Sequence, residues 1–271
     1  RLHARFALNK NTVFRISAGR GQRTANIFAD NMGYFISNRL PIIRSTSANA
    51  AYGLKPEVVW NLGANITKNF KLNGKDGSIS IDYYRTFFTS QVIVDLEQNN
   101  RIVFYDLEGK SFSNSAQIEL DYELFKRFDI RMAYRFYDVK STYSGQLLER
   151  PLISRHRAFV NIEYKMKGNW SFDLTAQWYG NRRMPYTGDK PEIYQLPNRT
   201  PGYFLLNGQI SKTVFMNFDA YIGFENILNF QQKDPILAAN NPQNENFDAG
   251  LIWGPVFGRM TYIGIRYKIL K

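Results

Sequence analysis

Charged side chains recur at every second position in much of the segment 111–138, and they are the first candidates for chemistry in this chain. Successive side chains of an extended strand point to opposite faces, so charged residues at this spacing gather on one face. There they can pair with each other or with a solute. The segment offers no paired nucleophile and base and no metal-ligand spacing, so we expect no enzyme, metal site or cofactor. The charged residues of this face are Glu119, Asp121, Glu123, Arg131 and Arg135.

The alternate positions of the same segment are apolar, with Ile118, Leu120 and Tyr122 before a break at 126–127 and the same pattern after it. This predicts a hairpin of two long amphipathic strands. Two environments produce such an alternation. A soluble antiparallel sheet places one face on a core and the other in water, whereas a membrane barrel places its apolar face against lipid and its polar face against a wet interior.

Composition narrows the class of protein. The chain has 271 residues, of which 44% are hydrophobic and 15% aromatic, yet it has no run of the roughly 18 apolar residues that a membrane helix needs. It contains no cysteine, which excludes disulfides and thiolate metal sites. The net charge of +12 comes from Lys and Arg scattered along the chain, so nucleic acid is not expected as a partner. The chain opens at Arg1 without a targeting segment, which indicates a trimmed or partial protein.

Eleven segments show the two-residue alternation of a strand. Most are longer than the five or six residues typical of soluble strands, and they suit the roughly nine to eleven that cross a membrane. The connections between them alternate short and long along the whole chain, so tight turns lie at one rim and large loops at the other, as in outer-membrane barrels. The expected strands are 2–9, 12–20, 57–69, 77–95, 110–125, 128–138, 155–166, 169–181, 202–214, 217–227 and 258–270.

We therefore predict an all-β fold, a transmembrane up-and-down antiparallel β-barrel of the outer membrane. Backbone groups in lipid must all be paired, which requires a closed sheet. Eleven is an odd number, whereas single-chain bacterial barrels have even numbers of strands, so the segment corresponds to half of a 22-stranded barrel. The charged face then lines the lumen, and the rows of Phe, Ile, Leu and Tyr face hydrocarbon.

Six motifs follow one another along the chain: FRISAGRGQRTAN at 14–26, LKPE at 54–57, DYYRTFFTSQVIVDL at 82–96, RPLISRHRAFVNIEY at 150–164, GFENILNF at 223–230 and GIRYKILK at 264–271. In this order and spacing the chain resembles the TonB-dependent outer-membrane receptors, especially those of Bacteroidota, over essentially its whole length.

The resemblance implies that residues 1–271 form the C-terminal half of such a barrel, while the plug domain, the TonB box and the first barrel half lie outside these residues. It also implies TonB-coupled import of a scarce nutrient, such as a ferric siderophore or a cobalamin-like metal chelate. The implied partners are TonB, the plug domain of the same full-length chain, outer-membrane lipid, lipopolysaccharide and a small metal chelate. The charged residues of the lumen face are then expected to pair with each other or with the plug.

The long loops 21–56, 182–201 and 228–257 are the predicted place of ligand capture, because cationic loops concentrate anionic solutes. An alternative reading of the first loop has Gly19 and Gly21 letting the strand bend out at the rim, with the neighbouring arginines against headgroups or lipopolysaccharide. The predicted ligand contacts are Arg20, Arg23, Arg39, Arg44, Arg182, Arg183, Tyr186 and Trp253.

Other features support the fold rather than a ligand site. His156 shares the parity of the apolar face and lies far in sequence from His3, which indicates an interfacial residue rather than a metal ligand. Phe224 and Asn226, in the segment FENILN, are predicted to support the fold. Two other functions stay open: a passive porin or adhesin barrel, which would leak current in a planar bilayer, and a soluble β-sandwich binding module, which would purify without detergent.

Overall fold

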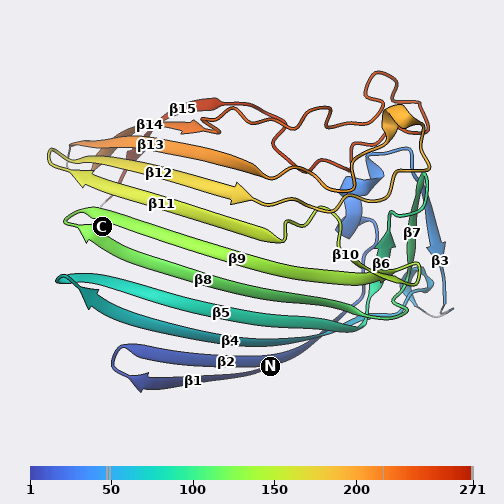
Figure 1. Cartoon of the computed structure of the whole chain (residues 1–271), viewed down its shortest axis with the longest axis horizontal. Coiled ribbons are helices and arrows are strands. Elements are labelled where there is room, and N and C mark those ends of the chain that lie inside the picture. Colours follow the sequence, from blue (N-terminus) through green and yellow to red (C-terminus); the bar gives the residue numbers. More distant parts are fainter. Residues whose placement is uncertain (47, 49, 216, 270–271) are drawn as a thin grey trace.

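The computed structural model of the chain describes residues 1–46, 48, 50–215 and 217–269. The described residues form one curved antiparallel sheet of twelve strands, eleven of which pair one after the next along a single path, while β10 (Gln146–Glu149) pairs with β9 beside it (Figure 1). The eleven strands of the path are β1 (Leu2–Asn9), β2 (Thr12–Arg23), β4 (Glu57–Leu72), β5 (Lys75–Ser90), β8 (Ser111–Phe125), β9 (Phe128–Tyr143), β11 (His156–Met166), β12 (Trp170–Tyr179), β13 (Tyr203–Phe215), β14 (Phe218–Glu225) and β15 (Met260–Tyr267). The predicted up-and-down antiparallel sheet is therefore confirmed.

The short turns lie at one end of this sheet and the long loops at the other (Figure 1). The connection between β4 and β5 is shorter than the predicted 70–76, because both strands extend to a two-residue turn. That turn is Asn73–Gly74, with φ of 51° and 74°. Positive φ at both central positions is the geometry that asparagine and glycine tolerate best and that matches the twist of a hairpin.

The prediction of a single strand over 77–95 is wrong. The barrel strand β5 ends at Ser90, and β6 (Val92–Asp95) turns away into a separate sheet with β7 (Arg101–Asp106) and β3 (Leu40–Arg44). Val92 and Ile93 are adjacent in sequence and both buried, so the alternation of an exposed and a covered face stops at this point. The second sheet lies wholly within segments that were predicted as loops or as the end of a barrel strand.

The remaining elements also belong to the loop end. β9 extends to Tyr143 and forms a hairpin with β10 (Gln146–Glu149), where only a loop was predicted over 139–154. Three short 3-10 helices complete the elements: η1 (Ala29–Phe35), η2 (Ala51–Gly53) and η3 (Glu192–Tyr194). Within the described residues, no helix is long and apolar enough to cross a membrane.

The outward face of the sheet is an apolar band without a second layer over it in the described part of the chain. Large apolar side chains remain exposed there, with Ile118 at 43%, Leu174 at 41% and Ile265 at 68%. A soluble sandwich would bury this face, so the soluble β-sandwich alternative is wrong. One row of the band runs across six strands in direct register: Ile79, Leu120, Met132, Val160, Ala176 and Leu206.

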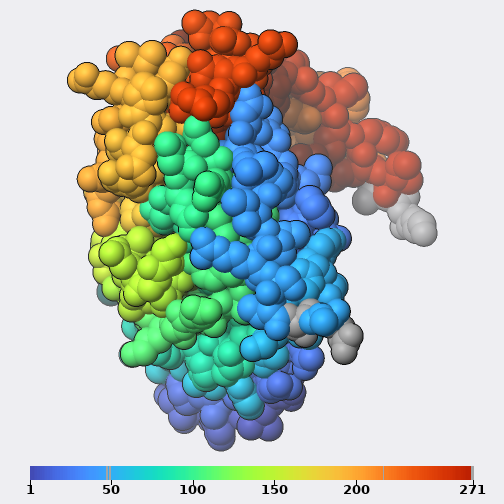
Figure 2. Space-filling view, turned by 90° about the vertical axis from the view of Figure 1, so that its right-hand side faces the viewer, coloured from blue at the N-terminus to red at the C-terminus, as the bar shows by residue number. Residues whose placement is uncertain are grey.

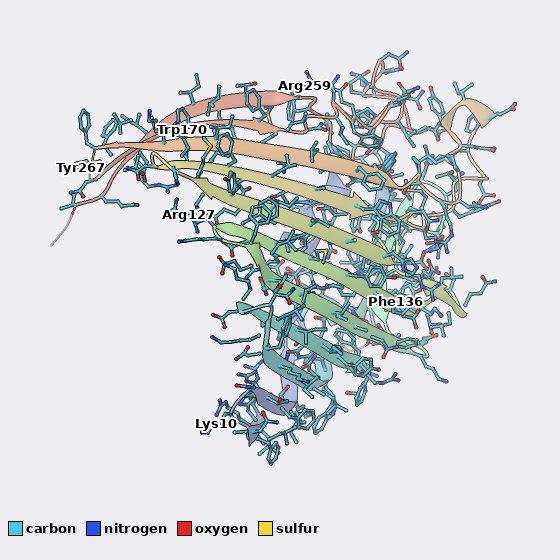
Figure 3. The ribbon with its side chains drawn as sticks, turned by 60° about the vertical axis from the view of Figure 1, so that its left-hand side comes forward. Lys10, Arg127, Phe136, Trp170, Arg259 and Tyr267 are labelled. Carbon is cyan, nitrogen blue, oxygen red and sulfur yellow. The ribbon has the colours of Figure 1, made fainter. Side chains whose placement is uncertain are left out.

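Aromatic residues flank this band at both ends. Toward the turn end, Phe128 and Tyr164 lie opposite each other across β9 and β11, and Trp170 starts β12. Toward the loop end, Trp178 lies opposite Phe204. Figure 3 shows Trp170, Arg127, Lys10 and Tyr267 near the turn end, with Phe136 on the opposite side. Amphipathic rings at two levels are typical of strands that cross a bilayer, because the rings favour the headgroup region.

The fully buried core lies beneath the loops rather than between sheets. Ile27, Leu54, Val92, Ile102 and Phe104 pack together, with relative exposures of 7% or less. They come from the loop 21–56 and from the small sheet, so these segments form one packed unit. Figure 2 shows blue, green, yellow and red loop segments crowded over this end of the molecule.

Candidate functional site

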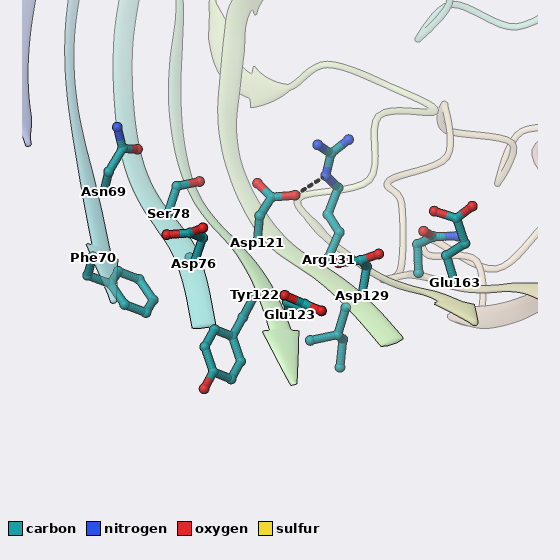
Figure 4. A pocket seen from close by; sticks show the side chains of 13 residues that line it. Asn69, Phe70, Asp76, Ser78, Asp121, Tyr122, Glu123, Asp129, Arg131 and Glu163 are labelled. Carbon is teal, nitrogen blue, oxygen red and sulfur yellow. Dashed lines mark hydrogen bonds and ion pairs between the residues drawn. The ribbon is translucent and has the colours of Figure 1, made fainter. Parts of the chain in front are cut away.

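The concave face of the sheet carries the charged residues picked out by their alternation. Asp121 accepts a hydrogen bond from Arg131 across β8 and β9, and both side chains point away from the side occupied by Tyr122 and Phe70 (Figure 4). Glu119 lies 3.6 Å from the same guanidinium. The guanidinium of Arg131 is therefore held by Asp121, with Glu119 close by.

Four carboxylates form a row toward the turn end of this face. Glu123, Asp129, Glu163 and Asp173 are direct cross-strand neighbours on β8, β9, β11 and β12. The first three line an open cavity of about 760 Å³ together with Arg131 (Figure 4). Among the described residues, no group of three or more His, Cys, Asp or Glu side chains has the geometry to hold a metal ion.

Most of the loop arginines predicted to contact ligand are occupied by the protein itself. Arg23 pairs with Glu57 at 2.7 Å and with Asp30 at 3.1 Å. Arg39 pairs with Asp248 at 2.7 Å. Both ion pairs hold the loops together; the Arg39 side chain is buried, whereas that of Arg23 remains 61% exposed.

Arg183 is held in the same way. It forms a bidentate pair with Glu97, with N–O distances of 2.6 and 3.0 Å, and the backbone N–H of Tyr186 donates to the same carboxylate. The Tyr186 ring itself is exposed. Bidentate arginine–carboxylate pairs are geometrically specific, so this contact fixes the loop 182–201 against the small sheet.

The other predicted loop residues differ in their surroundings. Arg20 lies opposite Trp60, at the loop-end edge of the apolar face and away from the concave wall. Arg44 lies 5.9 Å from the ring centroid of Tyr105. Arg182 donates to the hydroxyl of Tyr203 and to the carbonyl of Trp253. The structure thus brings Arg182 and Trp253 together but separates Arg20 from the rest.

Lys190 joins three of the loops through a polar network. Its ammonium donates to Asn246 at 3.2 Å and to Asn100, and it lies near the Arg39–Asp248 pair. Burial lowers the pKa of Lys190, and the nearby charge of Arg39 lowers it further. Neither Lys190 nor Asp248 was predicted from the sequence, because their partners lie far away in the chain.

A strip of arginines and tyrosines on the concave wall was also missed. Arg135 and Arg157 are direct cross-strand neighbours on β9 and β11, and Tyr179 is the next residue in the same row. Arg157 lies over the rings of Tyr137 and Tyr179, with distances of 5.8 and 5.5 Å to the ring centroids. Arg157 occupies one of the polar alternate positions of its strand, as Arg135 does in β9. The alternation in the sequence could therefore have predicted that Arg157 lies on the same face.

The sheet is a curved antiparallel meander with an apolar outer band, two levels of aromatic residues and a charged concave wall, and its loops pack together at one end. These features define part of an outer-membrane β-barrel. The chain belongs to the TonB dependent receptor-like β-barrel family, whose model matches residues 1–227. Members of this family are transporters of the outer membrane rather than enzymes.

Solved structures show the same fold at low sequence identity. The ferric-catecholate import receptor Fiu from E. coli K12 is 16% identical with a TM-score of 0.63, over 97% of this chain and 34% of that one. The copper transporter OprC is 15% identical with a TM-score of 0.68, over 98% and 37%. The ferric enterobactin receptor PfeA from Pseudomonas aeruginosa is 12% identical with a TM-score of 0.65, over 98% and 39%.

The chain thus spans between about a third and two fifths of the length of these structures. None of the curated proteins compared with the chain matches it.

Proposed function

We propose that the chain forms part of an outer-membrane receptor that imports a scarce nutrient by TonB-coupled transport. The nutrient in this proposal is an anionic metal chelate, such as a ferric siderophore or a cobalamin-like compound. The observation that carries the proposal is the charged concave wall beneath packed loops, in a chain of the TonB-dependent receptor family. Two of the similar structures are named for ferric chelates and one for copper, which supports a metal-containing substrate.

The proposal includes a longer polypeptide, of Bacteroidota type, in which residues 1–271 are the C-terminal half of a 22-stranded barrel. Within the described residues, β1 and β15 each pair on one side only. Because lipid cannot satisfy free backbone groups, both edges require further strands in the membrane. A plug domain and a TonB box from the same polypeptide would fill the lumen and couple it to TonB, and lipopolysaccharide would contact the outer rim.

The packed loops favour an importer over a passive porin. The loop 21–56 and the small sheet form a single buried core at the loop end, whereas a porin requires an open aqueous channel.

Uptake of a radioactive ferric chelate by cells that carry the full-length receptor tests the function. We expect uptake that stops when TonB is deleted or the proton gradient is collapsed. Steady current through the receptor in a planar bilayer, together with uptake that is independent of TonB, would instead identify a passive pore.

A further inference from the structure

We infer that the arginine–tyrosine strip on the concave wall, formed by Arg135, Arg157, Tyr137 and Tyr179, is a binding site for a polyanionic solute with paired oxygen atoms, such as a polycarboxylate. This inference rests on the proposed function and places ligand recognition on the wall rather than on the loop arginines. It begins from the register, because Arg135 and Arg157 lie directly opposite each other on β9 and β11.

Like charges directly opposite each other across two strands destabilise a sheet. Some charged side chains of the wall are paired with an opposite charge, as Arg131 is with Asp121. By contrast, neither Arg135 nor Arg157 has a carboxylate oxygen within the 4.0 Å of an ion pair in the described part of the chain. The two guanidinium groups therefore lie side by side without an ion pair in the described residues.

The side chains are held in place by neutral partners. Arg135 donates to Gln117 at 2.5 Å and to the hydroxyl of Tyr137 at 2.8 Å. Arg157 is flanked by the rings of Tyr137 and Tyr179, and its Nε is buried without a hydrogen-bond partner. Stacking against an aromatic face leaves the edge of a guanidinium free to donate to an anion.

A cavity of about 370 Å³ opens at this strip, and Arg135, Arg157, Gln177 and Tyr179 line it. Its volume is within the usual range of small-molecule sites. Glu119 also lines the cavity and lies 3.6 Å from Arg131, whose nearer partner is Asp121, so the cavity holds two guanidinium groups and one carboxylate. The cavity thus combines unpaired donors, aromatic walls and room for a small solute.

The chemistry of the donors selects the ligand class. A planar guanidinium donates two parallel hydrogen bonds to two oxygen atoms of a carboxylate or phosphate. Two guanidinium groups side by side therefore favour an anion with at least two such oxygen pairs, while a neutral solute of the same size gains little. A polycarboxylate that chelates iron or copper has this arrangement.

Citrate binding to the full-length receptor in detergent at low ionic strength, measured by titration calorimetry, tests the inference. We expect the wild type to bind citrate, but not the uncharged triethyl citrate. Substitutions R157Q and R135Q should each weaken citrate binding by about tenfold or more, the loss expected for one charge-assisted pair. R157K should be intermediate, because it keeps the charge but loses the paired donors.

The matched control is R15Q, on the same face of the sheet but on β2, where Arg15 donates to Asn65 at 2.9 Å and does not line the cavity. It should leave the citrate affinity unchanged, and heat-modifiable migration on gels should show that every variant is folded. The site is overturned if the wild type does not bind citrate, or if R15Q weakens binding as much as R157Q. TonB-dependent chelate uptake that is unchanged in R157Q would overturn the site and leave the proposed transport function standing.

Discussion

Arg39 and Asp248, which are 209 residues apart in the chain, form a buried ion pair of 2.7 Å. Their side chains are 3% and 2% exposed. Arg39 also donates to the carbonyl oxygens of Leu96 and Arg101, so one guanidinium joins the first long loop, the small sheet and the last long loop. The loop end of the molecule is therefore a single connected structure.

Substitution R39M should loosen this loop cluster without unfolding the barrel. Removing one partner of a buried ion pair typically costs about 3–5 kcal/mol, because the other charge is left buried and unpaired. Hydrogen exchange measured by mass spectrometry should show faster exchange in 228–257 and unchanged exchange in β8 and β9.

The double variant R39M/D248L is the matched control, because it removes both charges and should recover part of the protection. Unchanged exchange of 228–257 in R39M would mean that the pair does not hold the loops together.

Val160 and Asn161 are neighbours on β11 that point to opposite faces of the sheet, which permits a matched test of the apolar band. V160R should destabilise the barrel by about 2–4 kcal/mol, the cost of an arginine on the lipid face near the middle of the bilayer. N161R should cost much less, since that side chain faces the concave wall. Urea unfolding of the full-length receptor in lipid vesicles measures both. Equal losses in the two variants would contradict the assignment of the faces.

Tyr105 lies in the small sheet, outside the membrane-spanning strands. Burial, assisted by the charge of Asp95, raises the pKa of Tyr105 to about 12 from its ordinary value of 10.0. Its hydroxyl donates to Asp95 at 2.9 Å. As the pH rises above 10 the unfolded state loses this proton first, so the stabilising contribution is present below pH 10 and is lost between pH 10 and about 12.

The tyrosinate absorbance of wild type and of Y105F is measured as the pH is raised. The difference between the two curves gives the titration of Tyr105 separately from that of the other tyrosines. The difference should titrate with a midpoint near pH 12 in the folded receptor and near 10 in denaturant. A folded-state midpoint near 10 would show that Tyr105 is solvated.

Asn226 directly follows the last residue of β14 and is expected to be a structural residue. Its amide donates to the carbonyl of Phe230 at 2.7 Å and accepts from the N–H of the same residue at 3.0 Å, and its φ is 50°. N226A should cost about 1–3 kcal/mol, because buried backbone groups lose their partners. N226G removes the same hydrogen bonds, but glycine adopts this positive φ without strain. It should therefore lose only the stability that these hydrogen bonds supply. The urea midpoint of the full-length receptor measures both, and an unchanged midpoint in N226A would refute the role.

The alternation of polar and apolar residues was enough to predict the barrel strands. In β8 and β9, for example, the polarity of each side chain indicates which face of the sheet it lies on. The same rule could not reveal β3, whose parallel partner β7 lies in another loop and whose pairing leaves no period in the sequence. It also made β5 too long, because the apolar run of β6 follows it directly. The arginine ligand candidates were selected by their charge and their place in long loops, and pairing partners such as Glu57, Glu97 and Asp248 could be identified only from the folded chain.

The absence of cysteine makes the solvent on each face directly measurable. Single cysteines placed from Ile118 to Glu123 in the full-length receptor can carry nitroxide labels in lipid vesicles. Collision with oxygen, which concentrates in hydrocarbon, should peak at positions 118, 120 and 122, and collision with a water-soluble nickel chelate should peak at 119, 121 and 123. Collision rates without a two-residue period, or with the opposite phase, would contradict the assignment of lipid to the apolar face.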